Sequence, residues 1–109
     1  MTVEELQTRC DYWIERLSLG EWRGRVKVLL KTPKFLLKTT GYESVGACWW
    51  SAEECRAEIY LRKGEGESTL LHELVHLVLQ GHTTYKDGDE MLERAINRLA
   101  AALLEGRLD

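Results

Sequence analysis

The chain has 109 residues, a length typical of one domain whose core needs no disulfide scaffold. Hydrophobic residues make up 44% and charged residues 30%, which is the composition of a soluble globular protein. The net charge of −3 and the pI near 5.7 argue against binding to nucleic acid or membranes through non-specific electrostatics. No apolar run has transmembrane length, and the acidic N-terminus does not resemble a signal peptide. We therefore expect one soluble domain over residues 1–109, without nucleic-acid or membrane partners.

The first half of the chain predicts a helix followed by a strand. Residues 2–5, TVEE, have the form of a helix capping box, and apolar residues then recur with helical spacing as far as Leu17. Gly20 is expected to end this helix. Residues 25–31, RVKVLLK, alternate between apolar and polar side chains, which predicts a strand that ends at Pro33. The basic stretch KTPKFLLK, residues 31–38, is expected to be a solvated loop.

The second half predicts two more strands and two helices. Residues 45–50 are β-prone, and residues 56–63 alternate again. Helices are expected over residues 67–80 and 89–105, each followed by a glycine. The order α-β-β-β-α-α predicts a small α+β domain in which helices pack on a three-stranded sheet. Trp49 and Trp50 are adjacent on a strand, so one should be in the core and the other partly exposed.

The three cysteines do not predict a disulfide framework. Their number is odd, and Cys10, Cys48 and Cys55 form no CxxC pair. We interpret them as reduced thiols that fill space in a cytoplasmic protein.

All three histidines lie in LLHELVHLVLQGH, residues 70–82. His72 and His76 are four residues apart, so on a helix they share one face and can offer two imidazole nitrogens to one ion. Glu73 is displaced by about 100° around the helix and can hold a carboxylate over a water that the ion activates. This is the physical content of the HExxH signature of zinc metallopeptidases.

A metal-free interpretation of this helix is also possible. Its histidines could be core residues that donate hydrogen bonds to backbone carbonyls. The surrounding residues favour a metal instead, because an apolar helix has few other ways to satisfy two histidines and a glutamate. These neighbours are Leu70, Leu71, Leu74, Val75, Leu77, Val78 and Leu79.

A catalytic zinc site needs a third protein ligand and leaves one position open. His82 lies ten residues after His72, which is the spacing of the metzincin pattern. That pattern requires a glycine where this chain has Leu79, whereas the glycine here is Gly81. His82 is therefore the weaker candidate.

The last predicted helix offers two carboxylates. Glu90 has Arg94 four residues later, which is typical of a solvated ion pair. Glu93 lies beside the apolar stripe formed by Leu92, Ala95, Ile96, Leu99 and Leu103. We expect Glu93 to be the third ligand and Asn97 to hydrogen-bond one of the ligating histidines.

The segments HELVHLVL and ERAINRLAAALL together resemble the gluzincin pattern, in which a glutamate on a later helix completes HExxH. Among gluzincins the chain is most similar to the minigluzincins, which are related to ImmA/IrrE-type and SprT-like peptidase domains. The resemblance covers about residues 56–105. It implies a zincin-like fold, with RAEIYL as the strand beside the cleft. It also implies one Zn²⁺ per chain, held by His72, His76 and Glu93. Glu73 would be the general base, and Asn97 would hydrogen-bond one of the ligating histidines.

The expected function is zinc-dependent hydrolysis of a peptide or protein substrate. Tyr85 or His82, beyond the active-site helix, could stabilise the oxyanion. The alternative is a zinc-bearing regulatory or binding module of the same fold that does not cleave, or that is latent because its own chain fills the cleft. Water in the fourth coordination position of the zinc would favour the enzyme, and a side chain there would favour latency.

Overall fold

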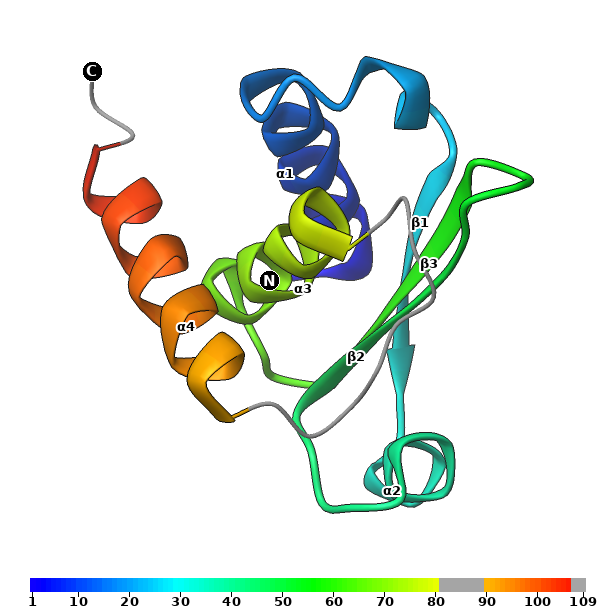
Figure 1. The fold of residues 1–109 in the computed structure, drawn as a ribbon. Helices are drawn as coiled ribbons and strands as arrows, with labels where there is room; N and C mark the ends of the chain where they lie inside the picture. The colour runs from blue at the N-terminus through cyan, green and yellow to red at the C-terminus, as the bar shows by residue number, and fades with distance from the viewer. Residues whose placement is uncertain (81–89, 107–109) are drawn as a thin grey trace.

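Three strands form one mixed sheet in the order β1–β3–β2 (Figure 1). The computed structural model describes residues 1–80 and 90–106, except for the side chains of residues 80 and 90–92. Strand β3 (Arg56–Arg62) is central. Strand β1 (Val26–Lys31) pairs with it in parallel, and β2 (Gly46–Ser51) pairs with it antiparallel. The three predicted strands are thus confirmed.

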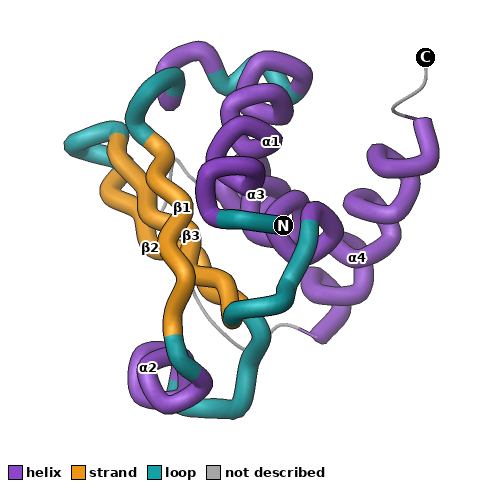
Figure 2. Tube along the Cα trace, turned by 180° about the vertical axis from the view of Figure 1, so that it is seen from behind, coloured by secondary structure: helices purple, strands orange, loops and turns teal. Residues whose placement is uncertain are grey.

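Most of the helical residues lie on one side of this sheet. Helices α1 (Val3–Arg16) and α3 (Glu67–Gln80) pack against it, and α4 (Glu90–Glu105) packs on the side of α3 away from the sheet (Figure 2). The short α2 (Pro33–Thr40) lies at the end of the sheet where β1 stops. The α+β class is confirmed. Within the described ranges, no helix is both long and apolar enough to cross a membrane.

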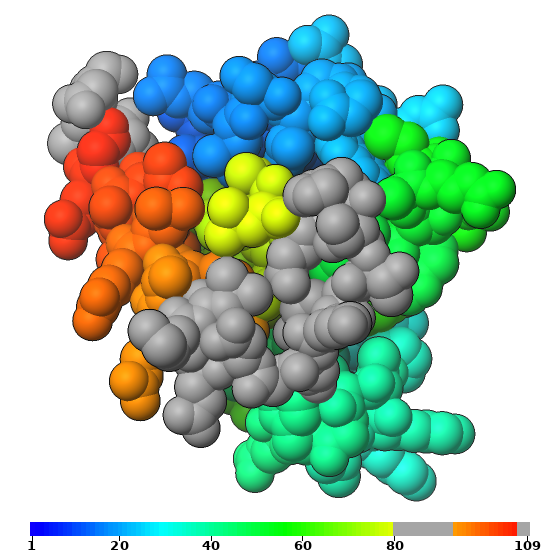
Figure 3. Space-filling model, viewed as in Figure 1, coloured from blue at the N-terminus to red at the C-terminus, as the bar shows by residue number. Residues whose placement is uncertain are grey.

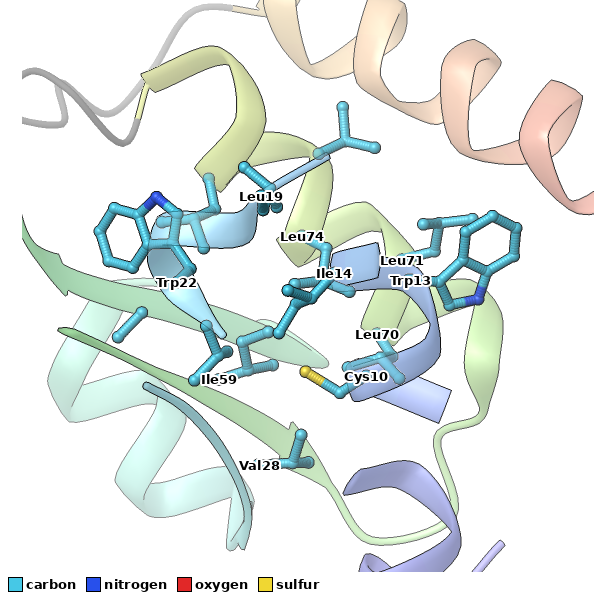
Figure 4. Packing of buried hydrophobic residues seen from close by; sticks show 14 of the residues in the cluster. Cys10, Trp13, Ile14, Leu19, Trp22, Val28, Ile59, Leu70, Leu71 and Leu74 are labelled. Atoms are coloured by element: carbon cyan, nitrogen blue, oxygen red, sulfur yellow. The ribbon is translucent and has the colours of Figure 1, made fainter. Parts of the chain in front are cut away.

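The core lies between the sheet and helices α1 and α3. Alternate residues of the strands point into it, because successive side chains of a strand face opposite ways. Side chains from both helices meet them there (Figure 4). The fully buried members include Leu6, Cys10, Trp13, Ile14, Ile59, Leu61, Leu70, Leu71, Leu74 and Ile96.

Helix α1 begins as predicted but ends earlier. Thr2 and Glu5 form the reciprocal capping box, with Glu5 N donating to Thr2 Oγ1 at 3.1 Å and Thr2 N donating to Glu5 Oε1 at 2.9 Å. The helix ends at Arg16, and Ser18 takes the left-handed conformation at φ 56°. Gly20 therefore does not end the helix. It begins the 3₁₀ turn Gly20–Trp22.

The expectation of a solvated loop over residues 31–38 is wrong, because most of these residues belong to helix α2. Thr32 is the N-cap, its hydroxyl accepting from Phe35 N at 3.1 Å, and Pro33 occupies the first turn, where a missing N–H costs nothing. Pro33 thus starts a helix as well as following a strand. Gly41, at φ 84°, ends that helix in the left-handed conformation.

The side chain of Gln7 occupies part of the outer edge of β1. Its Nε2 donates to Val26 O at 2.9 Å, and its Oε1 accepts from Val28 N at 2.8 Å. The amide therefore takes the place of a neighbouring strand and satisfies two edge groups that would otherwise need water or a partner.

We expect Gln7→Leu to lower the free energy of unfolding by about 1–3 kcal/mol, because Val26 O and Val28 N lose their partners. Urea denaturation measures this change. The neighbouring Thr8→Ala is the control, since Thr8 is exposed and bonds only within its own helix, to Glu4 O. Equal stability of the two variants would show that Gln7 does not protect this edge.

Candidate metal centre

Helices α3 and α4 bring three potential metal ligands together. His72 and His76 are one turn apart on α3, with ring centroids separated by 5.0 Å. Glu93 of α4 reaches both, its Oε2 lying 3.0 Å from His72 Nε2 and its Oε1 2.9 Å from His76 Nε2. One ligand atom from each residue can be chosen so that all three lie within 4.8 Å of one another. Donors this close can contact a single cation.

The hydrogen bonding of His72 prepares its Nε2 to bind a cation. Its Nδ1 lies 2.8 Å from Asn97 Oδ1, one helical turn after Glu93. Because an amide oxygen only accepts, Nδ1 must carry the proton, and neutral His72 then presents a lone pair at Nε2. That lone pair faces the Glu93 carboxylate, which is also an acceptor. A metal ion or a proton between them satisfies both groups.

We expect Asn97→Ala to weaken zinc binding by about 10–100-fold, as is typical when the partner of a ligating histidine is removed. Asn97→Asp keeps an acceptor for His72 Nδ1 and should retain affinity. Competition with a chromophoric chelator measures both variants. Unchanged affinity in Asn97→Ala would mean that Asn97 does not orient His72.

The N-terminal turn of α3 is fixed to α1 by a carboxylate. Glu67 Oε2 accepts from Arg9 Nε at 2.8 Å and from Trp13 Nε1 at 2.6 Å. On the other side of α3, Ile96 and Ala100 of α4 are buried in the core. The three candidate ligands therefore project from two helices that the core holds in place.

Glu73 lies next to the cluster and is buried, with 7% of its surface exposed. Burial and, to a lesser extent, the negative charge of Glu93 raise its pKa from 4.5 to about 8. Within the described ranges, no hydrogen bond is found to its carboxyl group. A buried carboxyl that lines a cavity, and that has no hydrogen-bond partner among the described residues, is suited to hold a water molecule or exchange a proton there.

The raised pKa predicts a pH-dependent stability for the metal-free chain. The folded state favours protonated Glu73. The contribution of this residue to the free energy of unfolding is therefore complete below about pH 4.5 and is lost as pH rises towards 8. Glu73→Gln removes the titration. We compare the free energy of unfolding of Glu73→Gln with that of the parent chain, both in the presence of chelator. The difference, variant minus parent, should be larger at pH 8 than at pH 4.5 by roughly 2–4 kcal/mol. Denaturation curves at the two pH values measure this, and an equal difference at both would contradict it.

A cavity of about 690 Å³ extends from the cluster along the sheet. Besides the cluster and Glu73, its walls include Thr39, Thr40, Ser44, Ser68, Thr69 and all of β2 except Ser51. The expectation that RAEIYL runs beside this cleft holds in part, since Tyr60 and Arg62 of β3 line the cavity. The strand with a free edge there is β2, because β3 is the central strand. Within the described part of the chain, β2 pairs with β3 alone.

The register of β2 determines what it offers to the cleft. Arg62 N donates to Val45 O at 2.9 Å, so by alternation the main-chain groups of Gly46 and Cys48 point away from β3. Gly46 also permits close packing against α3, because a Cβ there would lie 3.1 Å from Thr69 Cγ2 and 3.2 Å from Tyr60 O. A larger residue would push the strand away from the helix.

Reasoning from the sequence did not identify β2 or residues 39–45 as parts of the site. Pairing of Cys48 with Ile59, a core residue, places Cys48 on the face that α3 covers. The alternation of side chains in β2 indicates which of its residues share a face. The strand order that places β2 at the edge of the sheet cannot be read from the sequence. As predicted, one tryptophan is more exposed: Trp49 is 40% exposed and Trp50 is half-buried.

Two sequence candidates lie outside the described residues, namely His82 and Tyr85. The side chain of Glu90 is likewise not described. Glu93, the candidate third ligand whose side chain is described, lies beside the two histidines.

Comparison with known proteins finds no family model, no curated protein and no solved structure that matches the chain. The similarity to minigluzincins therefore stays a prediction from the sequence.

Proposed function

We propose that the chain is a zinc-dependent metallopeptidase with one Zn²⁺ per chain, held by His72, His76 and Glu93. The observation that carries this proposal is the approach of the Glu93 carboxylate to both histidine Nε2 atoms, at 3.0 and 2.9 Å, beside the buried Glu73. Two imidazole nitrogens and one carboxylate are a donor set typical of catalytic zinc, which keeps a fourth position for water or substrate.

Zn²⁺ in this position would polarise a peptide carbonyl and lower the pKa of a water molecule. Glu73 is then suited to be the general base, because its carboxyl lines the same cavity and has no protein partner in the described ranges. The cation would also favour the carboxylate form that a base requires. Asn97 would keep the Nε2 of His72 directed at the metal.

The substrate we propose is a peptide or protein segment in extended conformation. The edge of β2 offers main-chain donors and acceptors at Gly46 and Cys48, and added-strand pairing would hold an extended peptide there. The cavity beside this edge is large enough for side chains on both sides of the scissile bond. The three free cysteines support a cytoplasmic location.

A library of fluorogenic peptides tests the activity. We expect zinc-reconstituted protein to cleave some members, to lose that activity with a chelator and to regain it with added zinc. Stoichiometric zinc without cleavage of any member would instead favour a non-catalytic or latent zinc module.

A further inference from the structure

Positive charge is concentrated in one segment of this acidic chain. Residues 22–42 contain six of the 15 Lys and Arg but none of the 18 Asp and Glu. This segment forms β1 and α2. Net charge thus conceals a strong separation of charge, with the acidic residues distributed over the remainder of the chain.

The α2 surface, defined here as Lys31, Lys34, Leu37 and Lys38, presents this charge to solvent. Lys34, Leu37 and Lys38 are exposed and share one face of α2, opposite the buried Leu36. Leu37 is 51% exposed between the two lysines. The Nζ of Lys31 lies 4.5 Å from the ring centroid of Phe35. None of the three lysines forms an ion pair with a residue of the described ranges.

The α2 surface is continuous with the candidate active-site cavity. Thr39 and Thr40, the last residues of α2, line that cavity, and so do residues 42–45 that lead into β2. In the space-filling view the segment from α2 to β2 forms one end of the molecule (Figure 3). An extended chain that lies along β2 and passes Gly46 would therefore reach the lysines of α2.

We propose that the α2 surface is a docking site for an acidic segment of a protein substrate, with an apolar side chain placed on Leu37. Three ammonium groups without carboxylate partners are complementary to Asp and Glu side chains. The proposal rests on the function proposed above, and it adds that substrates carry an acidic stretch beside the scissile bond. Binding at both the cleft and α2 would raise affinity through effective concentration.

The same surface is less suited to nucleic acid. The arginine beside it in the sheet is Arg62, the register partner of Lys31, and its forked group, which would bind phosphate, already lies 3.4 Å from Glu65. Two aromatic rings on the adjoining face of the sheet already have partners. The ring of Tyr60 packs against Phe35, and the guanidinium group of Arg56 lies over the ring of Trp49. Both contacts would compete with the stacking of bases on these rings, although Trp49 is itself 40% exposed.

Fluorescence anisotropy with a labelled peptide of alternating Glu and Leu tests the proposal. We expect binding that weakens as salt rises from about 0.05 to about 0.3 M. The double variant Lys34→Glu/Lys38→Glu should lose about tenfold or more in affinity, whereas Arg98→Glu, at an exposed position of α4, should bind like the parent chain. A Gln and Leu peptide and a labelled oligothymidylate are the comparison probes.

Three results would overturn the docking site: no binding of the acidic peptide, an equal loss of affinity in Arg98→Glu, or tighter binding of the oligothymidylate. Anisotropy needs no hydrolysis, so this test is independent of activity. If the chain binds the acidic peptide but cleaves nothing in the peptide library, the proposed function fails and the docking site stands. If cleavage is observed but the peptide does not bind, the docking site alone fails.

Discussion

Glu73→Gln is expected to abolish peptide hydrolysis while the chain keeps its zinc. Glutamine is almost the same size but cannot accept a proton, so the loss should be about 10²–10⁴-fold in kcat, the usual contribution of a general base. Glu73 is not one of the three clustered ligands, and its removal leaves His72, His76 and Glu93 in place. The decisive pair of measurements is kcat on a cleaved library peptide and zinc content of the same sample.

The control for this variant is Glu43→Gln, which removes a carboxylate elsewhere in the lining of the same cavity. Its kcat should remain within a fewfold of the parent value. Activity retained in Glu73→Gln would remove Glu73 from the mechanism. Loss of zinc in that variant would show instead that Glu73 is needed for the metal site itself.

Glu93→Gln is expected to lose zinc while the fold survives. Removing a residue that hydrogen-bonds a zinc ligand typically lowers zinc affinity by about 10–100-fold. Replacing a charged ligand that contacts both histidines should therefore lower zinc affinity by more than about 100-fold. The glutamine amide can still hydrogen-bond to His72 and His76, so the contact between α3 and α4 should persist. Zinc affinity by chelator competition and helicity by circular dichroism measure the two parts separately.

Two matched variants accompany Glu93→Gln. Glu105→Gln changes an exposed carboxylate at the other end of α4 and should keep full zinc affinity. His82→Ala removes the competing candidate from the sequence and should also keep zinc. Loss of zinc in His82→Ala, with retention in Glu93→Gln, would move the site to a three-histidine type.

Features that depend on spacing along one helix could be predicted from the sequence. His72 and His76 face the same way because they are four residues apart, and the bounds of α3 agree with the predicted range. The position of Glu93 followed from its place beside apolar residues of the last helix. The details of that stripe were less accurate: Ile96 is buried as expected, but Leu99 is 45% exposed, because α4 packs against α3 along Ile96 and Ala100.

Features that depend on pairing between distant segments could not be predicted in this way. Local alternation identifies β2 and β3 as strands, but it does not tell which of them is at the edge. The edge along the cleft therefore belongs to β2, although β3 also contributes to the cavity lining. The bond of Gln7 to the edge of β1 joins residues 19 and 21 positions apart and leaves no periodic signal. Helix α2 was missed because Pro33 was interpreted only as the end of a strand, although Thr-Pro is also a helix-start signal.

The most direct test of the central claim is the metal content of the purified protein by inductively coupled plasma mass spectrometry, with Glu93→Gln measured in parallel. We expect one zinc per chain in the parent protein and a strong loss of zinc in Glu93→Gln. The absence of zinc from the parent protein, even after reconstitution, would contradict it. In that case His72, His76 and Glu93 would be a hydrogen-bonded cluster between two helices, and the proposal of a metallopeptidase would be wrong.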